Sequence, residues 1–211
     1  MAETTSLLRM RRGNSTEGSN PSRSATIAES LARGLRNFFC LLASGSLPSM
    51  SSHTLLPDDE RWMFKALEAA QRAELEGDVP VGCVVVHPEL GLVASAYNKR
   101  EAEQDPTAHA EVLALRQASQ NLRRWRLSDC TIYVTLEPCF MCAGALVNAR
   151  VRRVVYAATD AKAGACESLA NLLSDERLNH RCEWTRGVLE EPAREQLKSF
   201  FRARRKKTIQ E

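Results

Sequence analysis

The chain has 211 residues and a formal net charge of +3 at pH 7, with 44% hydrophobic and 26% charged residues. This length suits one compact domain with a segment left over, and no run reaches the roughly 18 consecutive apolar residues that a membrane helix needs. We therefore expect no transmembrane helix and no membrane partner. The seven cysteines, at irregular spacings, favour reduced thiols in a cytoplasmic protein over a disulfide framework.

Residues 1–52 are rich in Ser, Gly and Arg and show no sustained helical or strand periodicity. Such a segment cannot bury enough apolar surface to order itself, so we predict a disordered N-terminal extension. Two alternatives stay open for it. Arginines ahead of the apolar residues 38–42 suggest a targeting segment, and an over-extended start would place the first translated residue at Met50. The folded domain is expected over residues 53–211.

Apolar periodicity then predicts a series of helices and strands. A helix opens at Pro57 and ends at Gly77, and a hairpin of two β-branched strands follows. A hairpin followed by alternating helices and strands implies an α/β fold with a mixed sheet covered on both faces. The predicted strands span residues 81–87, 92–97, 131–135, 153–158 and 183–185, and the later helices span residues 106–119, 139–149, 168–173 (weaker) and 192–207.

The cysteine pair in Pro138-Cys139-Phe140-Met141-Cys142 follows the strand at 131–135 and opens the next predicted helix. Side chains three residues apart lie on the same side of a helix, so both sulfurs reach one point. A helix N-terminus also favours the thiolate, which is the form that binds metal. Redox pairs and structural zinc sites share this spacing, so the pair alone leaves these interpretations open.

The third candidate ligand is His109, which lies at the opening of the helix predicted over residues 106–119. A structural zinc site needs four protein ligands, and the sequence offers no second pair of cysteines or histidines with ligand spacing. Three protein ligands leave one coordination position for water, which is typical of catalytic zinc. The sequence therefore predicts a catalytic Zn²⁺ site formed by His109, Cys139 and Cys142.

Glu111 is the candidate catalytic residue. Attack of water on an amidine-like carbon needs a group that takes the water proton and hands it to the ring nitrogen and then to the leaving ammonia. Residues two apart on a regular helix point in different directions, so His109 must lie in the first turn. Each residue alone has a simpler interpretation as a packed or solvated side chain. Together, His-x-Glu followed by Pro-Cys-x-x-Cys is the pattern of zinc-dependent deaminases.

Further segments match a known family, at residues 79–82, 105–111, 134–139, 142–145, 154–156, 162–165, 178–181 and 200–201. From about residue 57 to residue 207 the chain resembles the bacterial-type tRNA-specific adenosine deaminases of the cytidine deaminase superfamily. The resemblance implies a cytidine deaminase-like three-layer α/β/α sandwich with a mixed sheet of about five strands. Glu167 and Cys83 depart from the family's pattern, which usually has Gly and Ala at these positions.

The resemblance also implies an activity, the hydrolytic conversion of the wobble adenosine of a tRNA anticodon to inosine with release of ammonia. The implied partner is the tRNA anticodon stem-loop, and the implied assembly is a homodimer with one Zn²⁺ per subunit. On matching positions, Asn98 would hold the target nucleoside near zinc. Asp160 and Asn171 would contact nucleotides of the anticodon loop.

The C-terminal stretch supports RNA contact, because residues 194–207 hold seven basic and one acidic side chain on an otherwise neutral domain. The resemblance implies that Phe200 or Phe201 contacts a flanking base and that Arg204 and its neighbours contact phosphates. A plain helix end, whose dipole favours cations, is the alternative. The arginines at 123, 124 and 126 and at 150, 152 and 153 are expected to form solvated faces.

Two other functions stay open. Deaminases of a free nucleobase or nucleotide, such as guanine, cytosine or deoxycytidylate, share the zinc chemistry. A catalytically silent RNA-binding partner subunit would keep zinc for structure alone. Such a subunit would tolerate loss of the carboxylate, so the presence of Glu111 favours an enzyme.

Overall fold

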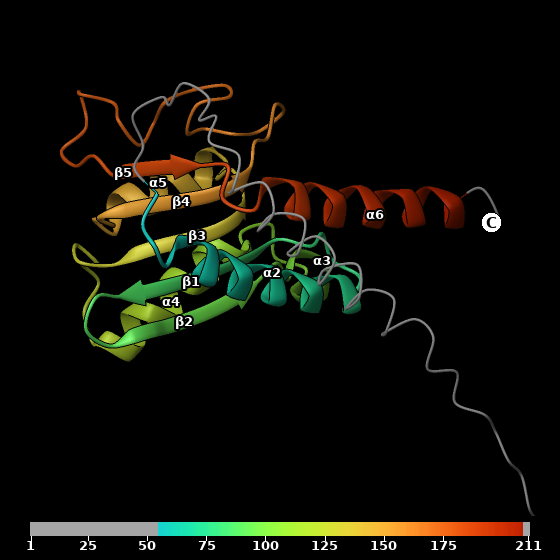
Figure 1. Ribbon diagram of the computed structural model, residues 1–211, viewed down its shortest axis with the longest axis horizontal. Helices are drawn as coiled ribbons and strands as arrows, with labels where there is room; N and C mark the ends of the chain where they lie inside the picture. The colour runs from blue at the N-terminus through green and yellow to red at the C-terminus, as the bar shows by residue number, and fades with distance from the viewer. Residues whose placement is uncertain (1–54, 209–211) are drawn as a thin grey trace, which may run out of the picture. The chain divides into compact units, whose positions relative to one another are not determined.

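The structure is a computed structural model that describes residues 55–208, with side chains described over residues 55–205. The predicted N-terminal extension, residues 1–52, lies outside the described residues. Within them, the chain forms three layers in which a β-sheet lies between two pairs of helices (Figure 1). This arrangement confirms the predicted α/β sandwich. Among the described helices, none has the length and apolar character needed to cross a membrane.

The sheet has five strands in the order β2-β1-β3-β4-β5. A hairpin pairs β1 (Gly82–His87) antiparallel with β2 (Gly91–Tyr97), and β1 also pairs antiparallel with β3 (Thr131–Leu136). The strands β3, β4 (Arg153–Ala158) and β5 (Glu183–Arg186) run parallel. The sheet is therefore mixed, as predicted. The carboxyl ends of β3 and β4 lie at the same end of the sheet.

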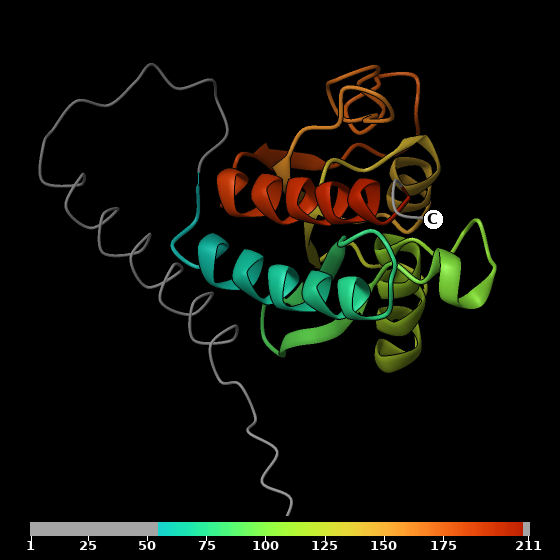
Figure 2. The same cartoon turned by 90° about the vertical axis from the view of Figure 1, so that its right-hand side faces the viewer.

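Two helices cover each face of the sheet. The helices α2 (Asp59–Leu75) and α6 (Glu190–Thr208) pack on one face and lie side by side (Figure 2). The other face carries α4 (Ala110–Leu122) and α5 (Phe140–Asn148). A short helix, α3 (Arg100–Glu103), lies between β2 and α4 along the chain, and the sequence does not predict it.

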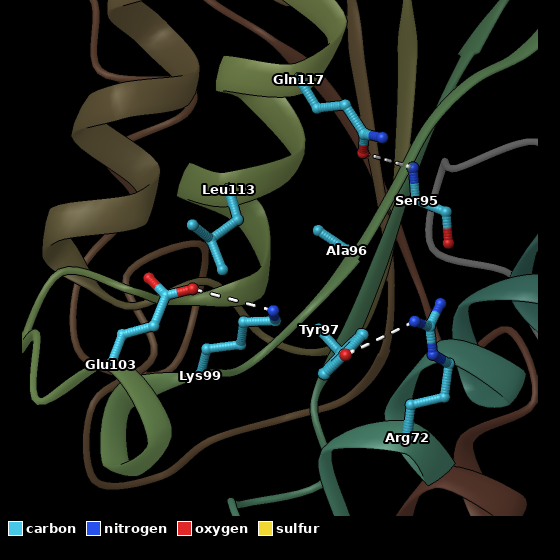
Figure 3. Close-up of a pocket in the computed structure, with 8 residues that line it drawn as sticks. All are labelled: Arg72, Ser95, Ala96, Tyr97, Lys99, Glu103, Leu113 and Gln117. Carbon is cyan, nitrogen blue, oxygen red and sulfur yellow. Dashed lines mark hydrogen bonds and ion pairs between the residues drawn. The ribbon is translucent and has the colours of Figure 1, made fainter. Parts of the chain in front are cut away.

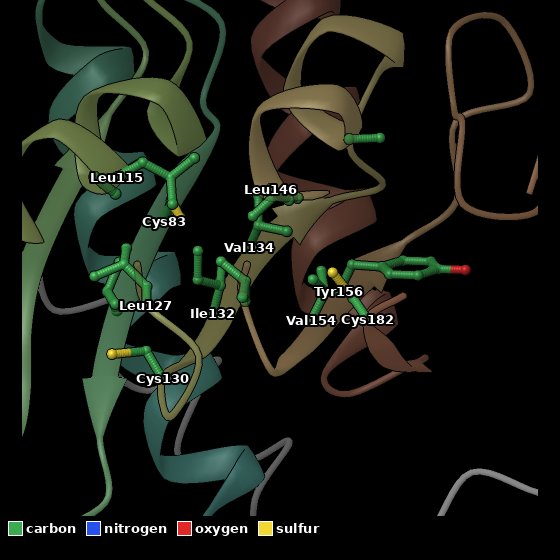
Figure 4. Close-up of a cluster of buried hydrophobic side chains, with 14 of the residues drawn as sticks. Cys83, Leu115, Leu127, Cys130, Ile132, Val134, Leu146, Val154, Tyr156 and Cys182 are labelled. Atoms are coloured by element: carbon green, nitrogen blue, oxygen red, sulfur yellow. The ribbon is translucent and has the colours of Figure 1, made fainter. Parts of the chain in front are cut away.

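Strand β1 is buried along most of its length because helices cover both of its faces. Its side chains alternate between the two halves of the core: Cys83 and Val85 pack toward α4 and α5, whereas Val84 and Val86 pack toward α2. Figure 4 shows part of the larger half, where Leu146 of α5 lies over the sheet. The six described cysteines are free thiols, as predicted.

A buried ion pair joins the start of α2 to the sheet. Arg153 donates one hydrogen bond of 2.8 Å to each carboxylate oxygen of Asp59. The Tyr133 hydroxyl donates to Asp59 at 2.9 Å, and Arg153 donates to the Thr185 hydroxyl at 2.9 Å. The prediction that Arg153 belongs to a solvated face is wrong, because its guanidinium is paired with a carboxylate inside the protein and only 6% of the residue is exposed.

The weaker helix predicted over residues 168–173 is also wrong, since this segment forms turns and irregular chain. The backbone N–H groups of Cys166, Glu167 and Ser168 donate to one carboxylate oxygen of Glu137 at 3.1, 2.8 and 2.9 Å. Glu137 lies far away in the sequence, at the end of β3. A distant acceptor therefore takes the amides where this segment begins and holds its start in turns.

Candidate active site

Three side chains with metal-ligating atoms meet beyond the carboxyl end of β3. The imidazole Nδ1 of His109 lies 3.7 Å from the Sγ of Cys139 and 3.5 Å from the Sγ of Cys142. The ligand atoms of all three residues lie within 4.8 Å of one another. Cys142 is buried, and the other two are partly exposed. The structure thus brings together the cluster that the spacing predicts.

Both halves of the cluster lie at helix N-termini. His109 is the N-cap residue of α4 and Cys139 is the N-cap residue of α5, and both have extended backbone conformations. Cys142 follows in the first turn of α5. The positive ends of two helix dipoles therefore point at the cluster, where they favour thiolates.

Helix α4 begins at Ala110, whereas the sequence predicts a start at residue 106. The carboxylate of Asp105 accepts the backbone N–H of Thr107 at 2.7 Å, and this local hydrogen bond holds the preceding residues in a turn. Because His109 lies just outside the helix, its side chain does not follow the helical direction. This satisfies the geometric requirement that His109 and Glu111, two positions apart, serve one centre.

The donor set fits zinc. One imidazole nitrogen and two thiolates are preferred zinc ligands, and tetrahedral bonds of about 2.0 Å to nitrogen and 2.3 Å to sulfur place neighbouring ligand atoms about 3.6 Å apart. The nitrogen-to-sulfur separations of 3.5 and 3.7 Å match that spacing. Three protein ligands leave a fourth position for water or substrate, as catalytic zinc sites do.

The surroundings make one of the two thiols acidic. Before metal binds, hydrogen bonds from Cys142 and His109 lower the pKa of Cys139 to about 4, although burial opposes the shift. The hydrogen bond with Cys139, together with burial, raises the pKa of Cys142. The hydrogen bond with Cys139 also raises the pKa of His109. One thiolate is therefore present at neutral pH, and the second proton must leave when a metal binds.

Glu111 lies in the first turn of α4 beside this cluster and is only 4% exposed. Burial raises the pKa of its carboxyl, and the charge of His109 and a hydrogen bond with Cys142 oppose the shift. A carboxyl group whose pKa moves toward neutrality can both accept and donate a proton. Its position and environment suit a proton-transfer group.

Asn98 lies at the end of β2 and is 7% exposed. Its Oδ1 accepts the backbone N–H of Ala110 at 2.9 Å, which satisfies one of the first amides of α4. The next residue, Lys99, donates its backbone N–H to the carbonyl of Ala108 at 3.0 Å. These two hydrogen bonds fix Asn98 against the segment that carries His109.

A basic groove lies between α6 and the loop that follows β4, with a cavity volume of about 450 Å³. We define the basic groove by its lining residues, Lys162, Leu197, Lys198, Phe201, Arg202 and Arg205. Phe201 is 43% exposed, so an aromatic face lies among four cations. The sequence does not predict the part of Lys162 or Lys198, although residues 198, 201, 202 and 205 follow the spacing of one helix face.

The two adjacent phenylalanines differ in their surroundings. Phe200 is 7% exposed, and its ring packs edge-on against Phe201 with the centroids 5.4 Å apart. The guanidinium of Arg204 lies 5.7 Å from the centre of the Phe200 ring. Of the two rings, Phe201 therefore lines the basic groove. Phe200 belongs to the packing beneath it.

The other predicted RNA contacts lie on the loop after β4. The Asp160 carboxylate accepts the backbone N–H groups of Lys162 at 2.9 Å and Ala163 at 3.2 Å, so it shapes the turn that carries Lys162. Asn171 is exposed on the irregular segment further along the chain. Glu167, which departs from the family's pattern, pairs with Arg186 of β5 at 2.6 Å. The Glu167 side chain is therefore directed to the sheet.

A second cavity, of about 370 Å³, lies along β2 between α2 and α4 (Figure 3). The cationic groups of Arg72 and Lys99 lie 4.6 and 5.3 Å from the centre of the Tyr97 ring. Lys99 pairs with Glu103 at 3.8 Å, and the Tyr97 hydroxyl donates to Glu76 at 2.7 Å. Because neighbours already engage these cations, we place no part of a substrate there.

Comparison with known proteins agrees with this geometry. A family model described as MafB19-like deaminase matches residues 57–205. The tRNA-specific adenosine deaminase of Bacillus subtilis is 48% identical over 153 residues, which cover 72% of this chain and 94% of the relative. That of Haemophilus influenzae is 44% identical over 147 residues, which cover 70% of this chain and 85% of the relative. The chain belongs to the tRNA-specific adenosine deaminases.

Solved structures share this fold. One, from work on A-to-I editing by tRNA:A34 deaminases at the wobble position of transfer RNA, is 38% identical with a TM-score of 0.62. It covers 65% of this chain and 99% of its own. A guanine deaminase from Nitrosomonas europaea, 24% identical with a TM-score of 0.59 over 74% of this chain and 98% of its own, shows likeness of fold alone.

Proposed function

We propose that this chain is a zinc-dependent hydrolase that converts the wobble adenosine of a tRNA anticodon to inosine. The observation that carries the substrate assignment is the basic groove, where Phe201 lies among the cations of α6 and Lys162. An aromatic ring in such a groove can stack a base while the cations neutralise phosphates. A free nucleobase has no phosphate and needs no such groove. Membership of the tRNA-specific adenosine deaminases supports the same substrate.

One Zn²⁺ per chain would be held by His109 Nδ1 and by the sulfurs of Cys139 and Cys142. The support is the donor set and its spacing, with nitrogen-to-sulfur separations of 3.5 and 3.7 Å. When bound, zinc in such a site supplies a nucleophile at neutral pH by lowering the pKa of water to about 7.

Glu111 would move the protons of the reaction. Its carboxylate takes the proton of the attacking water and delivers it to ring nitrogen N1, while an oxygen–carbon bond forms at C6. The carboxylate then takes the remaining proton from the new C6 hydroxyl and passes it to the departing amino group, so that the C6–N bond breaks, ammonia leaves and a carbonyl forms at C6. One water is consumed and one ammonia is released for each adenosine. Burial of Glu111 excludes bulk water from this transfer.

Asn98 would hold the target nucleoside beside the metal. Its Oδ1 already accepts the backbone N–H of Ala110, so Nδ2 is the atom that would donate to the substrate. The base must leave the anticodon stack before it can reach a site this deep. A fixed amide at the end of β2 gives the extruded nucleoside a defined position.

The nucleotides around the target would lie along the loop after β4 and α6. We propose that Phe201 stacks on a flanking base, because it is the exposed ring of the pair, while Phe200 supports it from below. Arg204 and the neighbouring cations of α6 would contact phosphates. Asp160 and Asn171 would contact loop nucleotides from the facing segment.

We also propose that the protein acts as a homodimer in the cytoplasm, with one zinc per subunit. Two large apolar side chains between the metal-ligating cysteines, Phe140 and Met141, support the assembly, because they are 51% and 37% exposed and would be covered by a second copy. Light scattering on the purified chain tests this, with the mass of two chains as the expected result.

A direct test compares two substrates on two proteins. Ammonia release is measured from tRNA with a wobble adenosine and from free guanine, for the natural chain and for Arg202→Ala/Arg205→Ala. We expect the natural chain to deaminate the tRNA and the double variant to lose most of that activity through a higher KM. Turnover of guanine without turnover of tRNA, unaffected by the double substitution, would favour a free-base deaminase.

A further inference from the structure

Glu137 is a buried acidic residue that the proposed chemistry does not use. It directly follows β3, is 2% exposed, and lies two positions before the metal-ligating Cys139. Its carboxylate accepts the backbone N–H of Asp160 at 2.9 Å as well as those of Cys166, Glu167 and Ser168. The Ser168 hydroxyl donates to it too. One carboxylate therefore holds both ends of residues 160–168.

Further contacts bind this loop to the turn that carries the metal ligands. The backbone N–H of Ala165 donates to the carbonyl of Pro138 at 2.9 Å. Gly164 and Cys139 pair as an isolated antiparallel β-bridge. A side chain at Gly164 would collide with the Glu137 carboxylate and with the carbonyl of Asp160. The loop thus lies directly against the metal-binding turn. Position 164 must be glycine, because the Glu137 carboxylate occupies the space that a side chain would need.

The same loop forms part of the basic groove. Lys162 lines the groove with Phe201 and the cations of α6. The turn that carries Lys162 starts at Asp160, whose side chain accepts the Lys162 backbone N–H and whose own N–H donates to Glu137. The position of Lys162 relative to Cys139 therefore depends on one carboxylate that lies between them.

A carboxylate suits this task better than the isosteric amide. Its two oxygens offer about four acceptor sites and no donor, which matches a set of converging N–H and O–H donors. A glutamine would turn an NH₂ group toward some of these donors and would leave buried amides without an acceptor. The negatively charged carboxylate, and not only the shape of the side chain, therefore holds residues 160–168 in place.

We propose that Glu137 is a positioning residue for the tRNA substrate. It fixes residues 160–168 on the metal-binding turn, so that Lys162 and the catalytic centre keep a set spacing along the bound anticodon loop. This inference rests on the proposed function. Glu137 acts through the loop and does not touch the reacting atoms.

The test is Glu137→Gln in the full-length zinc-loaded protein. We expect one zinc per chain to remain, KM for a tRNA with a wobble adenosine to rise on the order of tenfold, and kcat to change less than KM. Hydrogen exchange of the amides of residues 160–168 should become faster. Lys162→Ala should raise KM similarly. The KM of the double variant should not exceed that of the more impaired single variant, because both changes remove the same contact between Lys162 and the tRNA.

Asp59→Asn is the matched control, because it makes the same carboxylate-to-amide change in a buried, hydrogen-bonded residue at the other end of the sheet. It should lower stability and leave KM unchanged. Should Glu137→Gln fold poorly, Ser168→Ala removes a single donor and should give a smaller rise in KM. Provided that the natural chain edits tRNA, either of two results would overturn the inference. One is an unchanged KM in Glu137→Gln, and the other is additive effects of Glu137→Gln and Lys162→Ala on KM. Failure of the natural chain to edit tRNA would instead overturn the proposed function.

Discussion

The Nδ1 of His109 lies 3.5 Å from the Sγ of Cys142, although 33 positions separate the two residues. They meet because α4 and α5 both begin at the same end of the sheet, each with a candidate ligand at its N-cap position. Two helix N-termini thus converge on one point with one nitrogen and two sulfurs. This convergence makes the site suitable for a metal ion, whose positive charge would stabilise both cysteines as thiolates.

Cys139 should react as a thiolate once the metal is removed. Its pKa of about 4, lowered by the hydrogen bonds from Cys142 and His109, makes the iodoacetamide rate nearly constant between about pH 6 and pH 8. Cys130 and Cys182 serve as internal controls, because burial raises the pKa of each to about 12. Peptide mass mapping gives each rate. Added zinc should protect Cys139, and a rate that rises tenfold for each pH unit would contradict the expected thiolate.

Glu111→Gln should keep the metal and lose the chemistry. The amide has nearly the same shape but cannot take a proton from water, so we expect kcat to fall by about 10² to 10⁴ or more with one zinc still bound. Elemental analysis and ammonia release measure the two quantities. Glu68→Gln, an exposed change on α2, is the control and should stay within about twofold of the natural chain. Full activity in Glu111→Gln would remove the proposed general base.

Substitutions of the two adjacent phenylalanines should affect different quantities, KM for tRNA at one position and the free energy of unfolding at the other. Phe201→Ala should raise KM for tRNA with little change in the free energy of unfolding, because the ring is exposed in the basic groove. Phe200→Ala should lower the free energy of unfolding by about 3 to 5 kcal/mol, because it empties a buried site. Denaturant unfolding and steady-state kinetics measure the pair. The opposite pattern would assign the stacking contact to Phe200.

The Asp59–Arg153 ion pair should make stability depend on pH. Burial alone would raise the pKa of Asp59, but the hydrogen bonds from Arg153 and Leu56 lower it below its ordinary value of 3.8. A carboxyl with a lower pKa in the folded state stabilises the protein above the unfolded pKa, and this contribution is lost as pH falls through the folded value.

Asp59→Asn should therefore reduce the free energy of unfolding by about 3 to 5 kcal/mol at neutral pH, because it removes one partner of a buried ion pair. The difference from the natural chain should shrink below about pH 4. Urea unfolding of both proteins at each pH, with the same zinc supplied, gives this difference directly. A difference that stays constant down to pH 3 would show that the Asp59 charge does not stabilise the fold.

Much of the fold follows from local patterns in the sequence. All five strands of the structure are predicted, because β-branched runs such as that of β1 are bounded by turn residues. The start of α4 is not predicted correctly. The Asp105 carboxylate binds the backbone N–H of Thr107 and delays the helix, and a scan for helical periodicity does not register this competition.

Two other errors share one physical cause, a partner that lies far away in the sequence. Arg153 is buried because Asp59, from α2, pairs with it. Residues 168–173 form no helix because Glu137 takes the amide of Ser168, where this segment begins, and the amide of Glu167 just before it. The metal cluster is predictable because helix N-termini and ligand spacing are local features. The basic groove is only half predictable, since its stripe on α6 is local but the approach of Lys162 depends on Glu137.

The measurement that tests the central claim most directly is the fate of one adenosine. Zinc-loaded protein is incubated with a tRNA that has adenosine at the wobble position, and the product is sequenced after reverse transcription, where inosine is read as guanosine. We predict conversion at that position, none at other adenosines, and none with Glu111→Gln. Unchanged tRNA, in a preparation that releases ammonia from guanine, would contradict the account.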